Sequence, residues 1–361
     1  MKLKDTPEYV TLVPGHKGGP RNGHYAALDP DFAAIKDGVE GVIAGLWKAD
    51  DWTTFRNNWN ATGPLPAGTP QPGTDVAESY IKIPTRDGAE IELKIMQSAK
   101  HSTTAAASER IVVLRIHGGG FSIGGHTTEG VENLHAAAHP SVVLVSVDYR
   151  LAPEHPYPTP FNDCVDALQW VKANAASQLH ANPEKIVLLG GSAGSALCLS
   201  VALKAREEHI TGIVAMALDW PVGCHPKFFK QLTEQHGYEL QSYLQVPDGV
   251  VVGALVMEFF LDAHTPGNVQ PDPYHSPLLA ETFAGLPQAF IQIAGFDPLR
   301  DEGLAIAEKL QRDGVPNEVH IYPGLPHFFS ALLPDLEQTK KYQARQNAFI
   351  DKVVKAANAQ Q

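Results

Sequence analysis

The stretch from Lys185 to Glu208 reads KIVLLGGSAGSALCLSVALKAREE, and it decides the fold. Its first apolar run is typical of a buried parallel strand, and the run after Ser192 is long enough for a helix. Between them, residues 190–194 read GGSAG and match the pattern G-x-S-x-G. In this strand–turn–helix context a serine sits on a sharp turn with its hydroxyl lifted clear of the sheet. The pattern predicts that Ser192 is a nucleophile, and a purely structural turn is the alternative.

Further short apolar runs lie on both sides of this stretch, and helical stretches separate most of them. Such runs are buried on both faces, as the strands of a parallel sheet are. The sequence therefore predicts an α/β fold, with a mostly parallel central sheet flanked by helices. Asp87-Gly88 also predicts a hairpin turn before the parallel part. The expected strands are 76–84, 89–97, 111–116, 142–147, 186–189, 213–218, 290–294 and 319–322.

Two segments do not follow this alternation of strands and helices, and we expect them to form a helical cap. Residues 1–74 would be an N-terminal cap arm and linker, with amphipathic stretches at 31–47 and 50–59 and a Pro/Gly-rich run at 62–74. Residues 75–361 would form the catalytic body, and within it residues 222–264 would be a second, helical cap segment. The alternative is that both segments only fill out the core.

Composition excludes several classes of protein. The 361 residues carry 40 acidic and 28 basic side chains, a net charge of −12, and no block of Lys and Arg, which argues against a nucleic-acid binder. No apolar stretch is long enough to span a membrane, and residues 1–12 lack an apolar run of signal-peptide length. Cys164, Cys198 and Cys224 form no metal-type pair and indicate free thiols. We therefore expect a cytoplasmic protein without a membrane span.

A second glycine-rich motif follows the expected strand 111–116, where residues 117–121 read HGGGF. Consecutive glycines let backbone N–H groups point into a cavity, and a tetrahedral intermediate needs two or three such donors. Ala193, next to the serine, would supply one donor. Gly119 and Gly120 are the preferred others, and Gly118 is a weaker candidate. A flexible glycine loop is the alternative.

A nucleophilic serine needs a general base and a carboxylate that orients the base. In this type of fold the chain order is serine, acid, histidine. Asp297 directly follows the strand 290–294, and His327 lies in the loop after the last expected strand. Asp301 and Glu302 suit the start of the next helix, and His320 falls within a strand. Asp297 and His327 are thus the predicted acid and base, unless they are an ordinary turn aspartate and loop histidine.

Five motifs occur in order: HGGGF at 117–121, SVDYRLAPEHPYP at 146–158, GGSAG at 190–194, FDPLRDEG at 296–303 and PGLPHFF at 323–329. Together they resemble the hormone-sensitive-lipase-like esterases, which carry the HGGG motif, of the α/β-hydrolase superfamily. The resemblance extends from about Val76 to the C-terminus. It implies an α/β-hydrolase fold with a helical cap, and Ser192, Asp297 and His327 as the catalytic triad.

One departure concerns Gly191, because the family usually has an acidic residue or a threonine before or near this position. Glycine removes a side chain beside the nucleophile and leaves the details of the substrate open. The run 148–155 is expected to support the loop beneath the site through its own charge pairs. Direct catalysis by Asp148 or Glu154 is the less favoured alternative.

The sequence predicts a serine carboxylesterase that hydrolyses small to medium acyl esters through an acyl-enzyme, with no cofactor and no metal. Its partner would be a small-molecule ester, and the chain could form a homodimer. A lactone-forming cyclase, an acyl transferase, a dehydratase or, less favoured, a small-molecule receptor are the alternatives. The sequence does not specify the acyl group or the alcohol of the ester. The residues expected to contact substrate are Phe121, Trp220, Phe228, Phe229 and Phe328.

Overall fold

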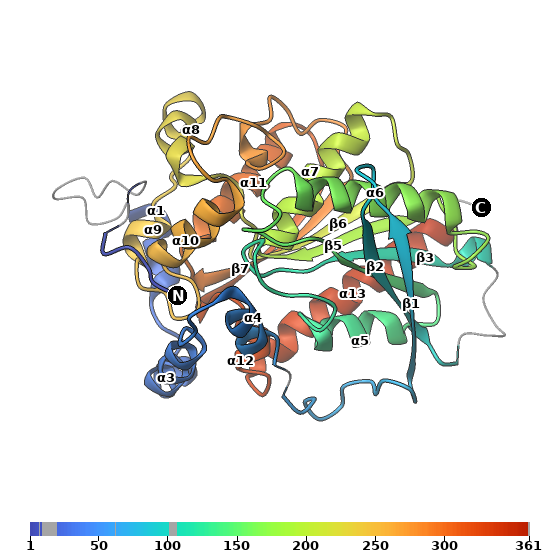
Figure 1. The fold of residues 1–361 in the computed structure, drawn as a ribbon, viewed down its shortest axis with the longest axis horizontal. Helices are drawn as coiled ribbons and strands as arrows, with labels where there is room; N and C mark the ends of the chain where they lie inside the picture. The colour runs from blue at the N-terminus through green and yellow to red at the C-terminus, as the bar shows by residue number, and fades with distance from the viewer. Residues whose placement is uncertain (7, 9–19, 62, 101–106, 360–361) are drawn as a thin grey trace.

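The computed structural model describes residues 1–359 except residues 7, 9–19, 62 and 101–106. Residues 7, 9–19 and 62 of the expected arm and linker therefore lie outside the described residues. The described chain forms one eight-stranded sheet with helices on both faces (Figure 1).

The sheet has the strand order β1-β2-β4-β3-β5-β6-β7-β8. β1 and β2 form the predicted hairpin, β2 pairs antiparallel with β4, and every later pair is parallel. The predicted α/β fold is confirmed. The strands are β1 (Val76–Pro84), β2 (Glu90–Ser98), β3 (Ile111–Ile116), β4 (Val142–Asp148), β5 (Ile186–Gly191), β6 (Ile213–Asp219), β7 (Gln288–Phe296) and β8 (Asn317–Pro326).

Helices cover the two faces of the sheet and bury a separate apolar core on each (Figure 1). The larger core joins the sheet to α6 (Thr159–Asn174), α7 (Ala193–Glu207) and α11 (Arg300–Arg312). The smaller core joins it to α5 (Gly130–Ala138) and α13 (Glu337–Ala359). Strands buried on both faces account for the continuous apolar runs in the sequence, because neither face of the central strands meets water.

The N-terminal arm contains α1 (Pro20–Gly23), α2 (Pro30–Ala33), α3 (Lys36–Leu46) and α4 (Trp52–Asn60). The amphipathic stretch 31–47 is therefore two helices rather than one, with the break at Ala34 and Ile35. Asp29 caps α2, and its side chain accepts hydrogen bonds from the N–H groups of Asp31 and Phe32. Asp51 caps α4 in the same way.

The segment between β6 and β7 forms three α-helices and two short 3-10 helices, where the sequence predicted a helical insertion. The α-helices are α8 (Phe229–His236), α9 (Ser242–Gln245) and α10 (Ala254–His264), and a short α12 (Phe329–Leu332) follows β8. Phe55 and Trp52 of the arm pack against Phe259 and Phe260 of α10, with ring centroids 5.3–6.4 Å apart. The arm and the insertion thus share a small aromatic core at one end of the sheet.

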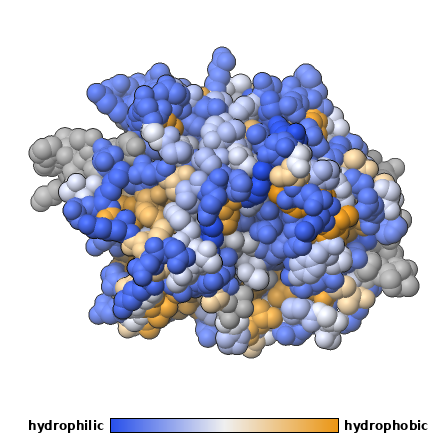
Figure 2. Space-filling model, in the orientation of Figure 1, coloured by the Kyte–Doolittle hydropathy of each residue, from blue (hydrophilic) through white to orange (hydrophobic). Residues whose placement is uncertain are grey.

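In the orientation of Figure 1, hydrophilic residues cover most of the surface, and apolar residues are exposed in separate areas (Figure 2). Among the described helices, none combines the length and the apolar character that a membrane span requires.

Replacing Phe55 with alanine tests this aromatic core. Phe55 is fully buried, so Phe55→Ala should lower the free energy of unfolding by about 3–5 kcal/mol. The matched control is Val42→Ala on α3, because Val42 is 62% exposed and its loss should change stability by less than about 0.5 kcal/mol. Thermal and denaturant unfolding measure both variants. Equal stabilities would contradict the docking of the arm on α10.

Candidate active site

Ser192 lies on the turn between β5 and α7, with φ 54° and ψ −123°. A positive φ is costly for a residue with a side chain, and such strain concentrates at functional sites. Hydrogen bonds hold the turn: the Ser192 N–H donates to the carbonyl of Asp219 at 2.8 Å, and Ser195 Oγ donates to the carbonyl of Gly190 at 2.6 Å. The turn therefore fixes where the Ser192 hydroxyl lies.

Asp219 ties this turn to the body of the protein, because its backbone carbonyl binds the turn and its side chain binds other elements. Its carboxylate accepts hydrogen bonds from Gln292 Nε2 at 3.0 Å, Tyr342 Oη at 2.8 Å and Gln346 Nε2 at 3.2 Å. Burial raises the pKa of Asp219 to about 7. One buried residue thus connects β5, β7 and α13 beneath the nucleophile.

Ser192, His327 and Asp297 form one chain of hydrogen bonds. Ser192 Oγ lies 3.0 Å from His327 Nε2, and His327 Nδ1 lies 2.7 Å from Asp297 Oδ2. The Leu299 N–H donates to the other carboxylate oxygen of Asp297 at 2.9 Å, which fixes its orientation. Asp297 and His327 are 1% and 4% exposed, so the hydrogen bond between them is shielded from water.

The neighbouring acids have other partners. Asp301 accepts from Arg300 Nε and from the Gln241 N–H, each at 2.9 Å. Glu302 accepts from the N–H groups of Gly223 and Cys224, and burial raises its pKa to about 8. His320 lies on β8 and contacts Glu318. Neither acid nor His320 has a hydrogen bond to Ser192 or His327 among the described residues.

The HGGG loop follows β3 and faces the turn at Ser192. Gly119 and Gly120 have φ values of 117° and 57°, which favour glycine. In the described chain, the N–H groups of Gly119, Gly120 and Ala193 donate to no other group, so they are available to an oxyanion. Gly118 differs, because its N–H donates to Glu129 Oε1 at 3.1 Å.

The run after β4 supports this loop from below. Tyr149 Oη donates to the carbonyl of His117 at 2.9 Å, and the two rings stack with centroids 4.2 Å apart. Burial lowers the pKa of His117 to about 3, so its ring is neutral and Nδ1–H donates to the carbonyl of Gly118. Arg150 pairs with Asp163 at 2.6 Å. The run thus lies beneath the HGGG loop as expected, but the expectation that its charges pair with one another is wrong. Arg150 pairs with Asp87 and Asp163, and Glu154 pairs with Arg56.

A pocket of about 340 Å³ opens beside Ser192 and His327. The N-terminal arm forms one wall through Trp59 and the start of the Pro/Gly-rich run, and the segment between β6 and β7 forms another. The pocket also borders the HGGG loop and the residues before α5. Its apolar side chains include Trp59, Leu65, Ile123, Val131, Val251, Val252, Met257, Phe260 and Phe328.

Only one of the five aromatic residues predicted to contact substrate, Phe328, lines this pocket. Phe121 stacks on His264 at 3.9 Å, and Trp220 stacks on Tyr342 at 5.1 Å, behind His327. Phe228 and Phe229 lie deeper in the insertion, where they pack near His225 and Tyr243.

Sequence reasoning expected aromatic residues of the arm, Trp59 among them, to form a pocket wall, but it did not single out Met257 or Phe260. The available signal was helical spacing, because Met257 and Phe260 are three residues apart and share one face of α10. In the described part of the chain, no group of three or more His, Cys, Asp or Glu side chains is arranged to hold a metal ion.

Comparison with known proteins places this geometry in a family. The model of a family described as alpha/beta hydrolase fold matches residues 113–331. An AB hydrolase superfamily protein of Schizosaccharomyces pombe is 34% identical over 336 residues, which are 88% of this chain and 91% of that protein. Carboxylic ester hydrolase LipN of Mycobacterium tuberculosis is 31% identical over 80% of this chain and 72% of its own length.

Among solved structures, vibralactone cyclase superposes with a TM-score of 0.77 at 25% identity, over 92% of this chain and 97% of that chain. The match to the family model spans the HGGG loop, the turn at Ser192, Asp297 and His327. The chain therefore belongs to the α/β-hydrolase fold family, in its hormone-sensitive-lipase-like branch.

Proposed function

We propose that this protein is a serine carboxylesterase that hydrolyses small to medium acyl esters. The observation that carries the proposal is the hydrogen-bond chain from Ser192 through His327 to Asp297. Its serine end opens into a pocket, next to N–H groups that have no partner among the described residues. The relationship to carboxylic ester hydrolase LipN supports the same reaction class.

In the proposed reaction, Ser192 Oγ attacks the ester carbonyl while His327 Nε2 takes its proton. Asp297 accepts the Nδ1–H bond, keeps the ring in the required tautomer and stabilises its protonated form. The N–H groups of Gly119, Gly120 and Ala193 stabilise the negative oxygen of the tetrahedral intermediate. His327 then protonates the leaving alcohol, and water hydrolyses the acyl-enzyme by the reverse sequence of proton transfers.

The pocket supports a preference for small to medium acyl groups. Its volume of about 340 Å³ suits a short chain, and its walls are largely apolar. We propose that residues 1–74 and 222–264 act together as a cap, because Trp59 comes from the first segment and Phe260 from the second. The alternative, in which these segments only fill out the core, does not account for their side chains in the pocket wall.

A lactone-forming cyclase is the second candidate, because the structure of vibralactone cyclase is similar to this one over nearly the whole chain. Both reactions use an activated serine and an oxyanion site. They differ in what resolves the acyl-enzyme, which is water in one case and a hydroxyl group of the substrate in the other. Hydrolysis in ¹⁸O-labelled water incorporates the label into the acid, whereas cyclisation does not.

We also propose a cytoplasmic location, as the sequence predicted. The support is that Cys164, Cys198 and Cys224 are all free and buried in the structure, which suits a reducing compartment. The proposed partner is a small-molecule ester, and the homodimer expected from the sequence stays a prediction.

Removing the nucleophile tests the proposed reaction. Ser192→Ala should lower kcat on p-nitrophenyl acetate by about 10³-fold or more without unfolding the protein. A serine-directed phosphonate should label the wild type at Ser192 and leave the variant unlabelled. Steady-state kinetics and peptide mass spectrometry measure the two effects. A variant rate within a few-fold of the wild type would rule out Ser192 as the nucleophile.

The acid is tested by comparing two neighbouring aspartates. Asp297→Asn should lower kcat by about 10⁴-fold, because an amide at this position favours the wrong tautomer of His327. Asp301→Asn is the control, since Asp301 contacts Arg300 and Gln241 instead of the histidine, and it should cost far less. If the two variants exchanged ranks in kcat, Asp301 would be the acid.

The pocket wall is tested with two phenylalanines of the same insertion. Phe260→Ala enlarges the pocket, so it should raise the ratio of kcat/KM for p-nitrophenyl hexanoate to that for the acetate by about tenfold. Phe229→Ala is the matched control, because Phe229 packs against Tyr243 outside the pocket lining. An equal shift in both variants would show that the pocket geometry does not determine the acyl preference.

A further inference from the structure

The space beside Gly191, directly before the nucleophile, is occupied by a carboxylate from another part of the chain. A Cβ atom at Gly191 would lie 2.7 Å from Glu129 Oε1 and 3.3 Å from Trp220 Nε1. Real Cβ atoms do not approach an oxygen so closely, so residue 191 has to be glycine while Glu129 holds this position. The absence of a side chain at position 191, which departs from the family pattern, is therefore explained by the position of Glu129.

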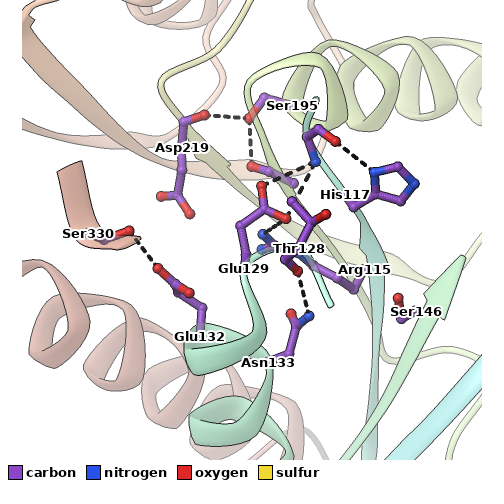
Figure 3. A network of polar contacts seen from close by, with 12 residues as sticks. Arg115, His117, Thr128, Glu129, Glu132, Asn133, Ser146, Ser195, Asp219 and Ser330 are labelled. Atoms are coloured by element: carbon purple, nitrogen blue, oxygen red, sulfur yellow. Dashed lines mark hydrogen bonds and ion pairs between the residues drawn. The ribbon is translucent and has the colours of Figure 1, made fainter. Parts of the chain in front are cut away.

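Glu129 is joined to both structures that build the oxyanion site. Oε1 and Oε2 accept the Gly118 N–H at 3.1 and 3.4 Å, and Oε1 fills the space that a Cβ at Gly191 would need. Figure 3 shows the carboxylate between the loop that follows β3 and the neighbouring turn. A Cβ at Gly118 would also lie 2.8 Å from Oε1. The carboxylate thus fills the gap between the HGGG loop and the turn at Ser192.

An ion pair fixes the carboxylate itself. Arg115 of β3 lies 2.9 Å from Glu129 Oε2, and the two side chains are 0% and 2% exposed. A buried guanidinium requires a partner of opposite charge, and removing that partner is strongly destabilising. Arg115 therefore anchors Glu129 from the floor of the site (Figure 3).

The backbone of Glu129 is strained in the same place. Its φ is 50°, in the left-handed region that side chains other than Gly, Asn and Asp seldom adopt. The conformation lets Glu129 precede α5 and still point its carboxylate under the HGGG loop. Strain of this kind persists only where the surroundings hold it, and it is common next to functional sites.

We propose that Glu129 is a positioning residue for the oxyanion site, holding the Gly118 peptide so that the N–H groups of Gly119 and Gly120 stay aimed at the substrate oxygen. The proposal rests on the esterase function proposed above. It also assigns Gly191 a role, since glycine there leaves room for a carboxylate that arrives from the loop before α5.

The first experiment separates the hydrogen bond from the buried charge. Two double variants, Arg115→Met with Glu129→Gln and Arg115→Met with Glu129→Met, both lack the ion pair and have similar volume. Only the glutamine can still accept the Gly118 N–H. The methionine variant should have a kcat on p-nitrophenyl acetate about 10–100-fold lower than the glutamine variant, with KM within about threefold.

The affinity for a transition-state analogue is a second measurement, which would not change if Glu129 only stabilised the fold. The affinity for phenylboronic acid, which forms a tetrahedral adduct with the serine, should fall by the same factor as kcat. Asp166→Asn is the matched control for stability, because Asp166 also accepts a backbone N–H and a guanidinium N–H, both from Arg86, and neither residue lines the pocket. It should lower the melting temperature while kcat stays within about twofold.

A second experiment tests whether side chains at positions 191 and 129 compete for the same space. Gly191→Asp alone should lose activity, because its side chain meets Glu129. Adding Glu129→Ala should restore part of it, so that the double variant exceeds both single variants. A double variant no better than the poorer single variant would overturn the proposal.

The outcomes also separate this inference from the proposed function. An active, phosphonate-labelled wild type with equal kcat and equal boronate affinity in the two Arg115→Met variants overturns the role of Glu129 and leaves the esterase intact. A wild type that neither hydrolyses esters nor is labelled at Ser192 overturns both. A parallel loss of kcat and boronate affinity supports the positioning role.

Discussion

The strained turn at Ser192 is the constraint on which the rest of the site depends. A backbone with φ 54° at a serine costs about 1–3 kcal/mol, so the surroundings have to supply that energy. They do so through the hydrogen bond from Ser192 to Asp219, whose carboxylate is bound in turn by side chains of β7 and α13. The position of the nucleophile is therefore set by the ends of the parallel strands, and the histidine and acid reach it from the loops after β8 and β7.

Much of this arrangement could be predicted from the sequence, because its signals are local. A few consecutive residues are enough to indicate the turn at Ser192 and the HGGG loop. The same holds for the strand ends before Asp297 and His327. The continuous apolar runs gave the parallel sheet, since they reflect burial on both faces. The break between α2 and α3 was missed because the apolar spacing continues across it.

The two cap segments could be expected from the sequence, but the side chains of the insertion that line the pocket and the Glu129 contact could not, for a physical reason. Trp59 and Phe260 belong to one aromatic cluster but are about two hundred residues apart in the chain, and nothing in either segment specifies the other as its neighbour. The carboxylate of Glu129 and the missing side chain at Gly191 likewise depend on a three-dimensional approach of two loops. A single sequence shows the glycine as a departure from the family pattern, and only the coordinates show what fills the space.

The shared aromatic core of the arm and α10 has a consequence for synthesis on the ribosome. The arm leaves the exit tunnel long before residues 254–264 have been translated, so Trp52, Phe55 and their neighbours wait for their partner in contact with solvent or chaperones. Closing that contact joins residues about two hundred positions apart, so its loop-closure entropy exceeds that of the strand pairs in the sheet. The pocket wall therefore cannot be completed before residues 254–264 have been synthesised, so the site acquires its substrate selectivity only after most of the chain has left the ribosome.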